Sequence, residues 1–184
     1  KESGLDVVFF GLESADNNVL KSMKKNITIE KTEASLKNVY DAGIAAYGCF
    51  IFGDIAETYE SAQKTIQWWK DHRQYNVHMT LIKPYPGTEI YKWCIENGVI
   101  KDPIKYLKDG CPQINISQMN EDQFSEIVKE INDLQDSKNT IDVELLELNP
   151  KTGRETVKGT CVKCSHVNIW EQIKMFAIDN IHCS

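Results

Sequence analysis

Long apolar runs and a secretion signal are missing from this sequence of 184 residues. A membrane-spanning helix needs roughly 18–20 consecutive apolar residues, so we expect no membrane span, and the first residues lack the pattern of a signal peptide. The sequence also lacks a GxGxxG loop, a Walker loop, a Ser-His-Asp arrangement and a paired-carboxylate motif, which argues against the common nucleotide-binding and hydrolytic enzymes. We expect a cytoplasmic protein.

An excess of positive charge is also absent. The 21 Lys and Arg residues are outnumbered by 27 Asp and Glu residues, and the net charge is −6. This balance argues against a nucleic acid or an anionic membrane as the main partner. Only residues 151–184 are mildly basic, with five Lys and Arg against three Asp and Glu. The length fits one domain with an appendage or two small domains.

Cysteine is too sparse for a secreted disulfide scaffold, since the chain has six, unevenly spaced. Cys49 and Cys94 lie inside apolar patterns, whereas Cys161, Cys164 and Cys183 cluster near the C-terminus. We therefore expect reduced thiols, three of which can bind a metal ion.

What the sequence does have is a repeated strand–helix pattern. Apolar runs that end shortly before Gly or Pro predict buried parallel strands at 7–10, 45–52 and 77–82. Amphipathic patterns, several of them preceded by a Thr that can serve as N-cap, predict helices at 17–25, 29–41, 59–71 and 89–97. In the third helix Trp69 is expected in the core and Trp68 partly exposed, because adjacent residues face different sides.

Three parallel βα units fit a doubly wound sheet or part of a (β/α)8 barrel. In both folds ligands bind at the carboxyl ends of the strands, which directs attention to residues 11–14, 53–58 and 83–88. Taken alone, each of these segments is equally compatible with an ordinary turn or a helix cap. A further amphipathic helix is predicted at 121–136, with Asn120 and Gln123 as a capping box.

The pattern changes after this helix. Residues 136–142 are polar and make the best linker, and residues 145–157 are predicted to form a hairpin that turns at 149–153. The fold class is therefore α/β, a partial barrel of about three parallel βα units followed by an amphipathic helix and a small zinc-ribbon-like β tail. The expected boundaries are 1–116 for the half barrel, 117–142 for the helix and linker, and 143–184 for the tail.

The tail cysteines have the spacing of a metal site. Cys161 and Cys164 form a C-x2-C pair, and eighteen residues separate Cys164 from Cys183, as in zinc ribbons. A second C-x2-C knuckle would place the fourth ligand at position 186, beyond the last residue; His166 or His182 are alternatives. Structural zinc, a rubredoxin-like iron site and ordinary thiols all remain open.

The strand-end segments taken together resemble the second half of a radical S-adenosylmethionine barrel. The resemblance covers roughly residues 1–98. Within the superfamily, the chain is most similar to the iron–sulfur oxidoreductases that often carry a cobalamin-binding domain, a class that includes magnesium-protoporphyrin monomethyl ester oxidative cyclase. The segments that carry the resemblance are 11–14, 19–25, 50–53, 57–58 and 84–88.

The resemblance implies a set of cofactor-binding residues. Glu13 and Ser14 would lie near the ribose and amino-acid part of S-adenosylmethionine, and Lys25 would pair with its carboxylate. A second group of residues lies on a strand that would pack against adenine. A third group lies in a loop that would border the adenine or the substrate. The residues concerned are Phe50, Ile51 and Gly53 in the second group, and Tyr85, Gly87 and Thr88 in the third; Glu57 is also predicted to bind the cofactor.

The C-x3-C-x2-C motif that holds the family's [4Fe–4S] cluster is absent from this sequence. The resemblance implies a parent enzyme that cleaves S-adenosylmethionine reductively to a 5′-deoxyadenosyl radical, acts on a small molecule and carries cobalamin in some relatives. We expect this chain to be a fragment, inactive alone and with weak or no cofactor binding, that self-associates through an open strand edge. The alternatives are a stand-alone α/β binding module with a structural zinc ribbon, and a different barrel or flavodoxin-like enzyme.

Overall fold

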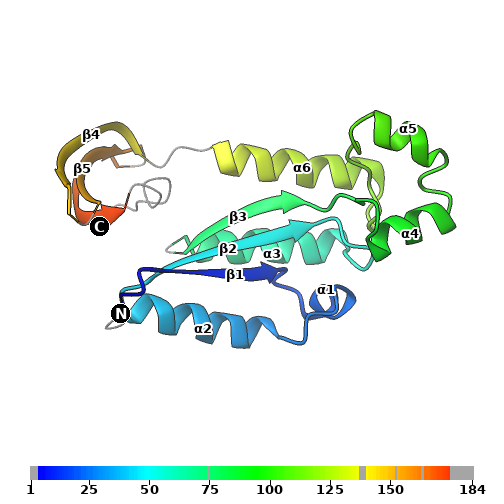
Figure 1. The fold of residues 1–184 in the computed structure, drawn as a ribbon, viewed down its shortest axis with the longest axis horizontal. Coiled ribbons are helices and arrows are strands. Elements are labelled where there is room, and N and C mark those ends of the chain that lie inside the picture. Colours follow the sequence, from blue (N-terminus) through cyan, green and yellow to red (C-terminus); the bar gives the residue numbers. More distant parts are fainter. Residues whose placement is uncertain (1–3, 74, 137–139, 152, 163, 175–184) are drawn as a thin grey trace.

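The computed structural model describes residues 4–73, 75–136, 140–151, 153–162 and 164–174. Its body is a parallel sheet in the order β1-β2-β3, built from β1 (Val7–Glu13), β2 (Ala45–Phe52) and β3 (Asn76–Leu81). In Figure 1 the three strands run in the same direction, with helices α2 and α3 against one face and α6 beside β3. The predicted parallel βα arrangement is confirmed.

The helices lie close to the predicted ranges. One difference is at α1, which ends at Ser22 because the chain turns through Lys24 at a φ of 57°. A second is α5, which was not predicted. The helices are α1 (Asn17–Ser22), α2 (Ile29–Asp41), α3 (Tyr59–Asp71), α4 (Glu89–Glu96), α5 (Pro103–Lys108) and α6 (Glu121–Asp136).

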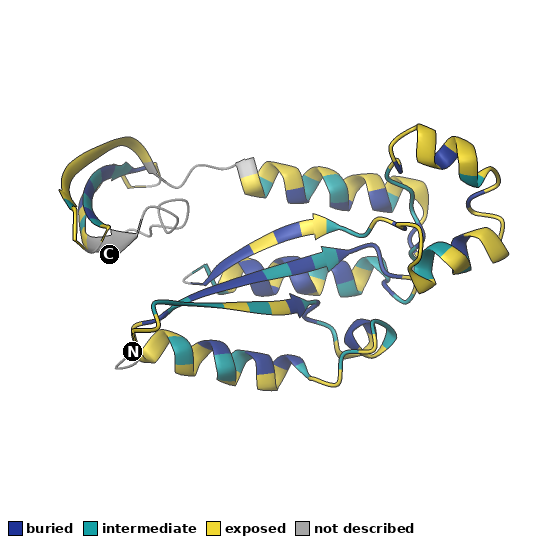
Figure 2. Ribbon diagram, viewed as in Figure 1, coloured by how far each residue is buried: buried dark blue, intermediate teal, exposed yellow. Residues whose placement is uncertain are grey.

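The two faces of the sheet differ in burial, since side chains alternate along each strand. Leu12, Phe50 and Phe52 point toward the helices and are at most 2% exposed. The opposite face is not covered by a helix in the described part of the chain: Phe9 is 76% exposed, and His78 is exposed as well. Figure 2 shows this alternation of buried and exposed positions along the strands.

The prediction that Trp68 is partly exposed was wrong, because both tryptophans of α3 are buried. Trp69 faces the sheet and donates its Nε1–H to the carbonyl of Val77 at 2.6 Å. Trp68 faces α2, where it donates to Glu33 Oε1 at 2.6 Å, and its ring meets Phe50 edge-on at 5.3 Å. The buried arc of α3 is wide because this helix packs against the sheet and α2 at once.

Helix α3 begins with a capping box. The Thr58 hydroxyl accepts a hydrogen bond from the Ser61 N–H at 3.2 Å, and the Ser61 hydroxyl accepts one from the Thr58 N–H at 2.9 Å. Replacing Thr58 by Ala leaves a helix-end N–H without its acceptor, and we expect a loss of about 1 kcal/mol in the free energy of unfolding, measured by urea denaturation.

The matched control for this prediction is Thr28→Ala. Thr28 is the N-cap of α2, but its side chain accepts no capping hydrogen bond. We expect this variant to lose less than about 0.5 kcal/mol. Equal losses in the two variants would contradict the role assigned to the capping box.

Helix α6 lies along α3 and β3 and partly covers the edge of the sheet. It begins with the predicted reciprocal pair, in which Asn120 and Gln123 each accept a hydrogen bond from the other's N–H. Lys70 of α3 pairs with Glu130 at 2.7 Å, and the Met79 N–H of β3 donates to Gln135 Oε1 at 2.9 Å. Self-association through an open edge would therefore use the β1 side, and it stays a prediction.

The tail is an antiparallel sheet of β4 (Thr140–Asn149), β5 (Arg154–Cys161) and β6 (Val167–Lys174), in that order. The predicted hairpin with its turn at 149–153 is confirmed, whereas β6 was not predicted. The linker expected at 136–142 is shorter at its C-terminal side, since β4 already begins at Thr140. Arg154 pairs with Asp6 at 2.6 Å, which links the tail to the start of the body. None of the helices in the described ranges is long and apolar enough to cross a membrane.

Candidate cofactor pocket at the strand ends

A cavity of about 680 Å³ opens at the carboxyl ends of the parallel strands, and we refer to it as the strand-end pocket. Its size lies within the roughly 300–1,000 Å³ that is usual for small-molecule sites. Three parts of the chain form its walls, namely the ends of the strands, the turn after α1 and helix α4. The lining residues are Glu13, Ser22, Met23, Lys24, Lys25, Ile51, Asp54, Ile55, Ile82, Glu89, Ile90, Lys92, Trp93 and Glu96.

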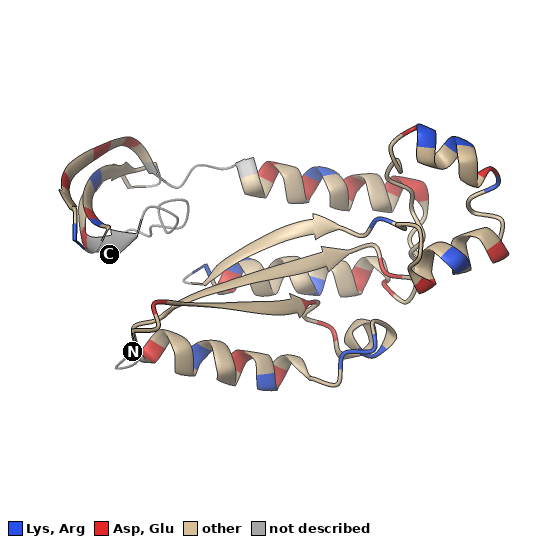
Figure 3. Cartoon of the chain, in the orientation of Figure 1, with Lys and Arg blue, Asp and Glu red and all other residues tan. Residues whose placement is uncertain are grey.

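One wall of the pocket is an ion pair. Lys25 Nζ lies 2.7 Å from Glu13 Oε1, and both groups lie directly above Gly11. A Cβ at position 11 would lie 2.9 Å from Glu13 Oε1 and 3.1 Å from Lys25 Nζ, so a larger residue there would require the ends of these two flexible side chains to shift. In Figure 3 acidic positions at the strand ends are red and the basic turn after α1 is blue.

The direction of the Glu13 side chain depends on a bulge in β1. The register with β2 shifts between Gly11 and Glu13, and Glu13 has a φ of 63°. Such a bulge adds a residue to one strand and redirects the side chains beyond it. Leu12 can thus stay in the core while Glu13 reaches the pocket and Lys25.

Part of the lining of the pocket is apolar. Ile51 and Ile82 come from the ends of β2 and β3, and Ile90 and Trp93 come from α4, where a spacing of three residues places them on one face. The Thr88 side chain caps α4 by accepting from the Tyr91 N–H at 3.2 Å. A flat apolar ligand group fits this wall, and a zwitterionic group fits the ion pair.

Of the ten predicted cofactor-binding residues, the structure brings Glu13, Lys25 and Ile51 together in the pocket wall. The remaining seven do not line it. Tyr85, Gly87 and Thr88 form the exposed turn that leads into α4.

Two of those seven lie in the core on the helix side of the sheet. Phe50 is 0% exposed and packs against Trp68, so the predicted adenine contact does not agree with its position. Ser14 is also buried, with its hydroxyl 3.3 Å from Thr65 Oγ1. Strand alternation explains the position of Phe50, because the even-numbered positions of β2 point away from the open face, whereas Ser14 lies just after the end of β1.

Gly53 and Glu57 form the turn below the pocket. Glu57 is 1% exposed, and its Oε2 accepts a hydrogen bond from the Gly53 N–H at 2.5 Å. Burial raises the pKa of Glu57 to about 7, this hydrogen bond opposes the rise, and the charges of Asp54 and Asp16 add to it. Gly53 has a φ of 98°, which favours glycine, and a Cβ there would meet Ile82 Cγ2 at 3.2 Å. The pair holds the end of β2 in place.

Several lining residues were not predicted. Ile90 and Trp93 could have been found from their helical spacing, whereas the contact between Lys24 and Glu89 joins α4 to the turn after α1 and leaves no sequence signal. Asp54, which is 4% exposed, follows Gly53 directly and could have been included with it.

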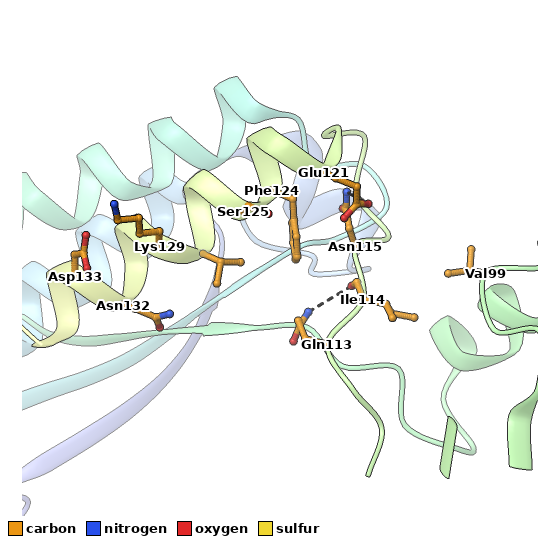
Figure 4. A pocket seen from close by; sticks show the side chains of 11 residues that line it. Val99, Gln113, Ile114, Asn115, Glu121, Phe124, Ser125, Lys129, Asn132 and Asp133 are labelled. Carbon is orange, nitrogen blue, oxygen red and sulfur yellow. Dashed lines mark hydrogen bonds between the residues drawn. The ribbon is translucent and has the colours of Figure 1, made fainter. Parts of the chain in front are cut away.

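A second cavity, of about 770 Å³, is lined by residues of α6, among them Phe124 and Lys129, and by the segment Gln113–Asn115 (Figure 4). Gln113 Nε2 donates to the carbonyl of Ile82 at 2.9 Å, which ties this segment to the end of β3. None of the predicted site residues lines the second cavity. The strand-end pocket is the better candidate, since ligands of parallel α/β folds bind at the carboxyl ends of the strands.

The predicted metal ligands lie in the tail. Cys161 ends β5, and Cys164 lies in the turn before β6. Cys183 is outside the described residues. Within the described ranges, no three His, Cys, Asp or Glu side chains lie close enough together to hold a metal ion.

Comparison of folds and sequences places the chain among known proteins. Its fold is similar to that of Elp3 from Methanocaldococcus infernus, with a TM-score of 0.50 and 15% identity over 90% of this chain and 50% of the other. This likeness concerns the fold alone. No family model matches the chain.

The sequence is similar to several methyl- and methylthiotransferases. It is 34% identical over 100 residues to an uncharacterized methyltransferase of Pyrococcus horikoshii, which is 54% of this chain and 22% of that protein. It is 29% identical over 101 residues to bacteriochlorophyllide d C-8(2)-methyltransferase of Chlorobaculum tepidum, with the same coverage of 54% and 22%. A putative methylthiotransferase of Methanocaldococcus jannaschii is 32% identical over 83 residues, or 45% of this chain and 18% of that protein.

The matched residues thus span about a fifth of each relative. The relatives and the fold together support the resemblance to the radical S-adenosylmethionine superfamily. The finer resemblance to the oxidative cyclase stays a prediction.

Proposed function

We propose that this chain forms the second half of a radical S-adenosylmethionine barrel in a methyltransferase or methylthiotransferase, and that the strand-end pocket borders the cofactor. The observation that carries the proposal is the Glu13–Lys25 pair, at 2.7 Å, close to the backbone of Gly11. The pair lines a pocket with several apolar residues, at the edge of the sheet where this class of fold binds ligands.

The residues present fit S-adenosylmethionine. Its amino group can donate to Glu13 and its carboxylate can pair with Lys25, each replacing half of the existing ion pair. The adenine can lie against Ile51, Ile90 and Trp93, since flat aromatic groups bind well to apolar and aromatic surfaces. S-adenosylmethionine supplies a methyl group or, after reductive cleavage, a radical; the part of this chain is to bind and orient it.

The residues of this chain do not fit a [4Fe–4S] cluster, because the sequence contains no C-x3-C-x2-C motif. We propose that cluster ligands are contributed by residues outside these 184. A cobalamin domain would also lie outside them, and both the cobalamin and the small-molecule substrate stay predictions.

The encoding gene gives the first test of this proposal. A reading frame that continues upstream and encodes C-x3-C-x2-C before the residues of β1 is the expected result. A start codon directly before residue 1 would exclude the half-barrel proposal and favour a stand-alone binding module.

Binding to the complete protein gives the second test. We expect Lys25→Met and Glu13→Gln each to weaken S-adenosylmethionine binding by about 10-fold, because each removes one charge-assisted hydrogen bond to the zwitterion. Equilibrium binding of radiolabelled cofactor measures the effect. The control is Lys37→Met, which removes a lysine paired with Asp41 on α2, outside the pocket. Equal effects in Lys25→Met and Lys37→Met would contradict the placement of the cofactor.

A further inference from the structure

Asp54 differs from the other carboxylates that line the strand-end pocket. Four carboxylates belong to this lining, and three of them are ion-paired with a lysine. The three pairs are Glu13–Lys25, Glu89–Lys24 and Glu96–Lys92. Asp54 has no ion pair with any residue that the structure describes, although its side chain is only 4% exposed.

One oxygen of Asp54 is held by the backbone, and the other is left for a ligand. Oδ1 accepts a hydrogen bond from the Ala56 N–H at 2.9 Å, as in an Asx turn. The carbonyl of the same residue accepts from the Glu57 N–H at 2.9 Å, which fixes the turn further. Within the described ranges no group donates to Oδ2, and this oxygen is not enclosed by protein atoms. The cavity that Asp54 lines is the strand-end pocket.

This arrangement favours a hydrogen-bond donor in the pocket. Burying a carboxylate costs free energy unless hydrogen bonds or an opposite charge compensate it, and Asp54 has a single backbone donor on its side chain. A hydroxyl or amino group of a ligand that donates to Oδ2 would add a charge-assisted hydrogen bond. The Asx turn holds the carboxylate in one orientation before the ligand arrives, so little conformational freedom is lost on binding.

The fit of S-adenosylmethionine to the pocket leaves one polar part of the cofactor without a partner. Its amino group and carboxylate are assigned to Glu13 and Lys25, and its adenine to the apolar residues, among them Ile51. The ribose joins these two parts, and its two hydroxyls still need an acceptor. Ser14, which was predicted to lie near the ribose, is buried on the helix side of the sheet. Asp54 instead follows the end of β2, the strand that also contributes Ile51.

We propose that Asp54 determines cofactor specificity by accepting a hydrogen bond from a ribose hydroxyl of S-adenosylmethionine. Acidic side chains bind ribose hydroxyls in this way in dinucleotide-binding α/β folds. The inference rests on the proposed function, because it requires the cofactor in this pocket. It adds a residue that lies outside the ten predicted cofactor-binding residues.

Competition binding to the complete protein tests the assignment. Radiolabelled S-adenosylmethionine is displaced by the unlabelled cofactor and by its 2′-deoxy and 3′-deoxy derivatives. We expect the parent to bind at least one deoxy derivative about 10-fold more weakly than the cofactor, because a site built around a hydroxyl rejects a ligand that lacks it. In Asp54→Asn the cofactor should bind about 10-fold more weakly, whereas the affinity for that deoxy derivative should change by less than about 2-fold. The asparagine keeps an oxygen for the Ala56 N–H, so the turn is preserved.

The matched control is Asp102→Asn. Asp102 also accepts a hydrogen bond from a backbone N–H, that of Lys105 at 2.9 Å, but it is exposed at the start of α5 and does not line the pocket. We expect its replacement to leave the affinities for the cofactor and for both deoxy derivatives unchanged. A purely structural role of Asp54 would weaken all three ligands alike, whereas contact with the ribose weakens only ligands that carry the contacted hydroxyl.

Failure of this inference and failure of the proposed function give different results. If Lys25→Met weakens binding of the cofactor as expected, equal affinities of the parent for all three ligands would overturn the inference alone. Equal weakening of all three ligands in Asp54→Asn would overturn it as well. A complete protein that does not bind S-adenosylmethionine, or equal effects of Lys25→Met and Lys37→Met, would instead overturn the proposed function and the inference with it.

Discussion

Replacing Phe50 by Ala is expected to lower the free energy of unfolding by about 3–5 kcal/mol. Phe50 lies in the central strand, is 0% exposed, and packs edge-on against Trp68 at 5.3 Å. Removal of its ring loses the burial of an aromatic side chain and leaves a cavity between the sheet and α3. Urea denaturation followed by tryptophan fluorescence measures the loss.

Phe9→Ala is the matched control for this substitution. Phe9 is the same residue type in the neighbouring strand, but it faces the uncovered side of the sheet and is 76% exposed. We expect this variant to lose less than about 1 kcal/mol. Similar losses in the two variants would mean that the sheet is covered on both faces and that the assignment of its core face is wrong.

Glu57→Gln is expected to make the protein more stable at alkaline pH. The ordinary pKa of this carboxyl is 4.5, and burial raises it to about 7 in the folded chain. Between these values the folded state keeps a proton that the unfolded state has lost, so stability falls as pH rises through this range. A shift of this size corresponds to about 3 kcal/mol lost above pH 7, and the glutamine does not incur this loss.

The measurement is the difference in unfolding free energy between variant and parent at a series of pH values. It should increase by about 3 kcal/mol from pH 4 to pH 8, mostly between the two pKa values. Comparison with the parent at each pH removes the effect of the other carboxyls. Glu60→Gln serves as the control, since Glu60 is exposed one turn of helix away and its pKa is lowered by hydrogen bonds from its own backbone N–H and from the Thr58 hydroxyl. A difference independent of pH would show that Glu57 is charged in the folded protein.

Local signals determine how much of the fold could be predicted. Strand β2 and helices α2, α3 and α6 have clear periodicity and recognisable caps, and their observed ranges match the predicted ones. Helix α5 was missed because its six residues are too few to show a period. The burial of Trp68 was missed because it depends on the position of α2, which the spacing within α3 does not contain.

The site was less predictable than the fold. The strand-end position pointed to Glu13, but Lys25 was found only through a family resemblance, since a bulge and a turn of left-handed backbone bring the two together. Phe50 and Ser14 were assigned to the cofactor from the same resemblance, although both are buried on the helix side of the sheet. Alternate positions of a strand face opposite sides of the sheet, and this rule can be applied to the sequence alone. It would have assigned Ile51 and Phe50 to different faces.

The bulge in β1 also limits how this chain can be re-engineered. Side chains alternate with a period of two, so deleting one residue between the start of β1 and the bulge would exchange the faces of every residue before the deletion. Phe9 would then be forced under the helices and Phe10 onto the open face. Designers who shorten, graft or permute this segment should remove residues in pairs, and should leave Gly11, Leu12 and Glu13 intact as one unit.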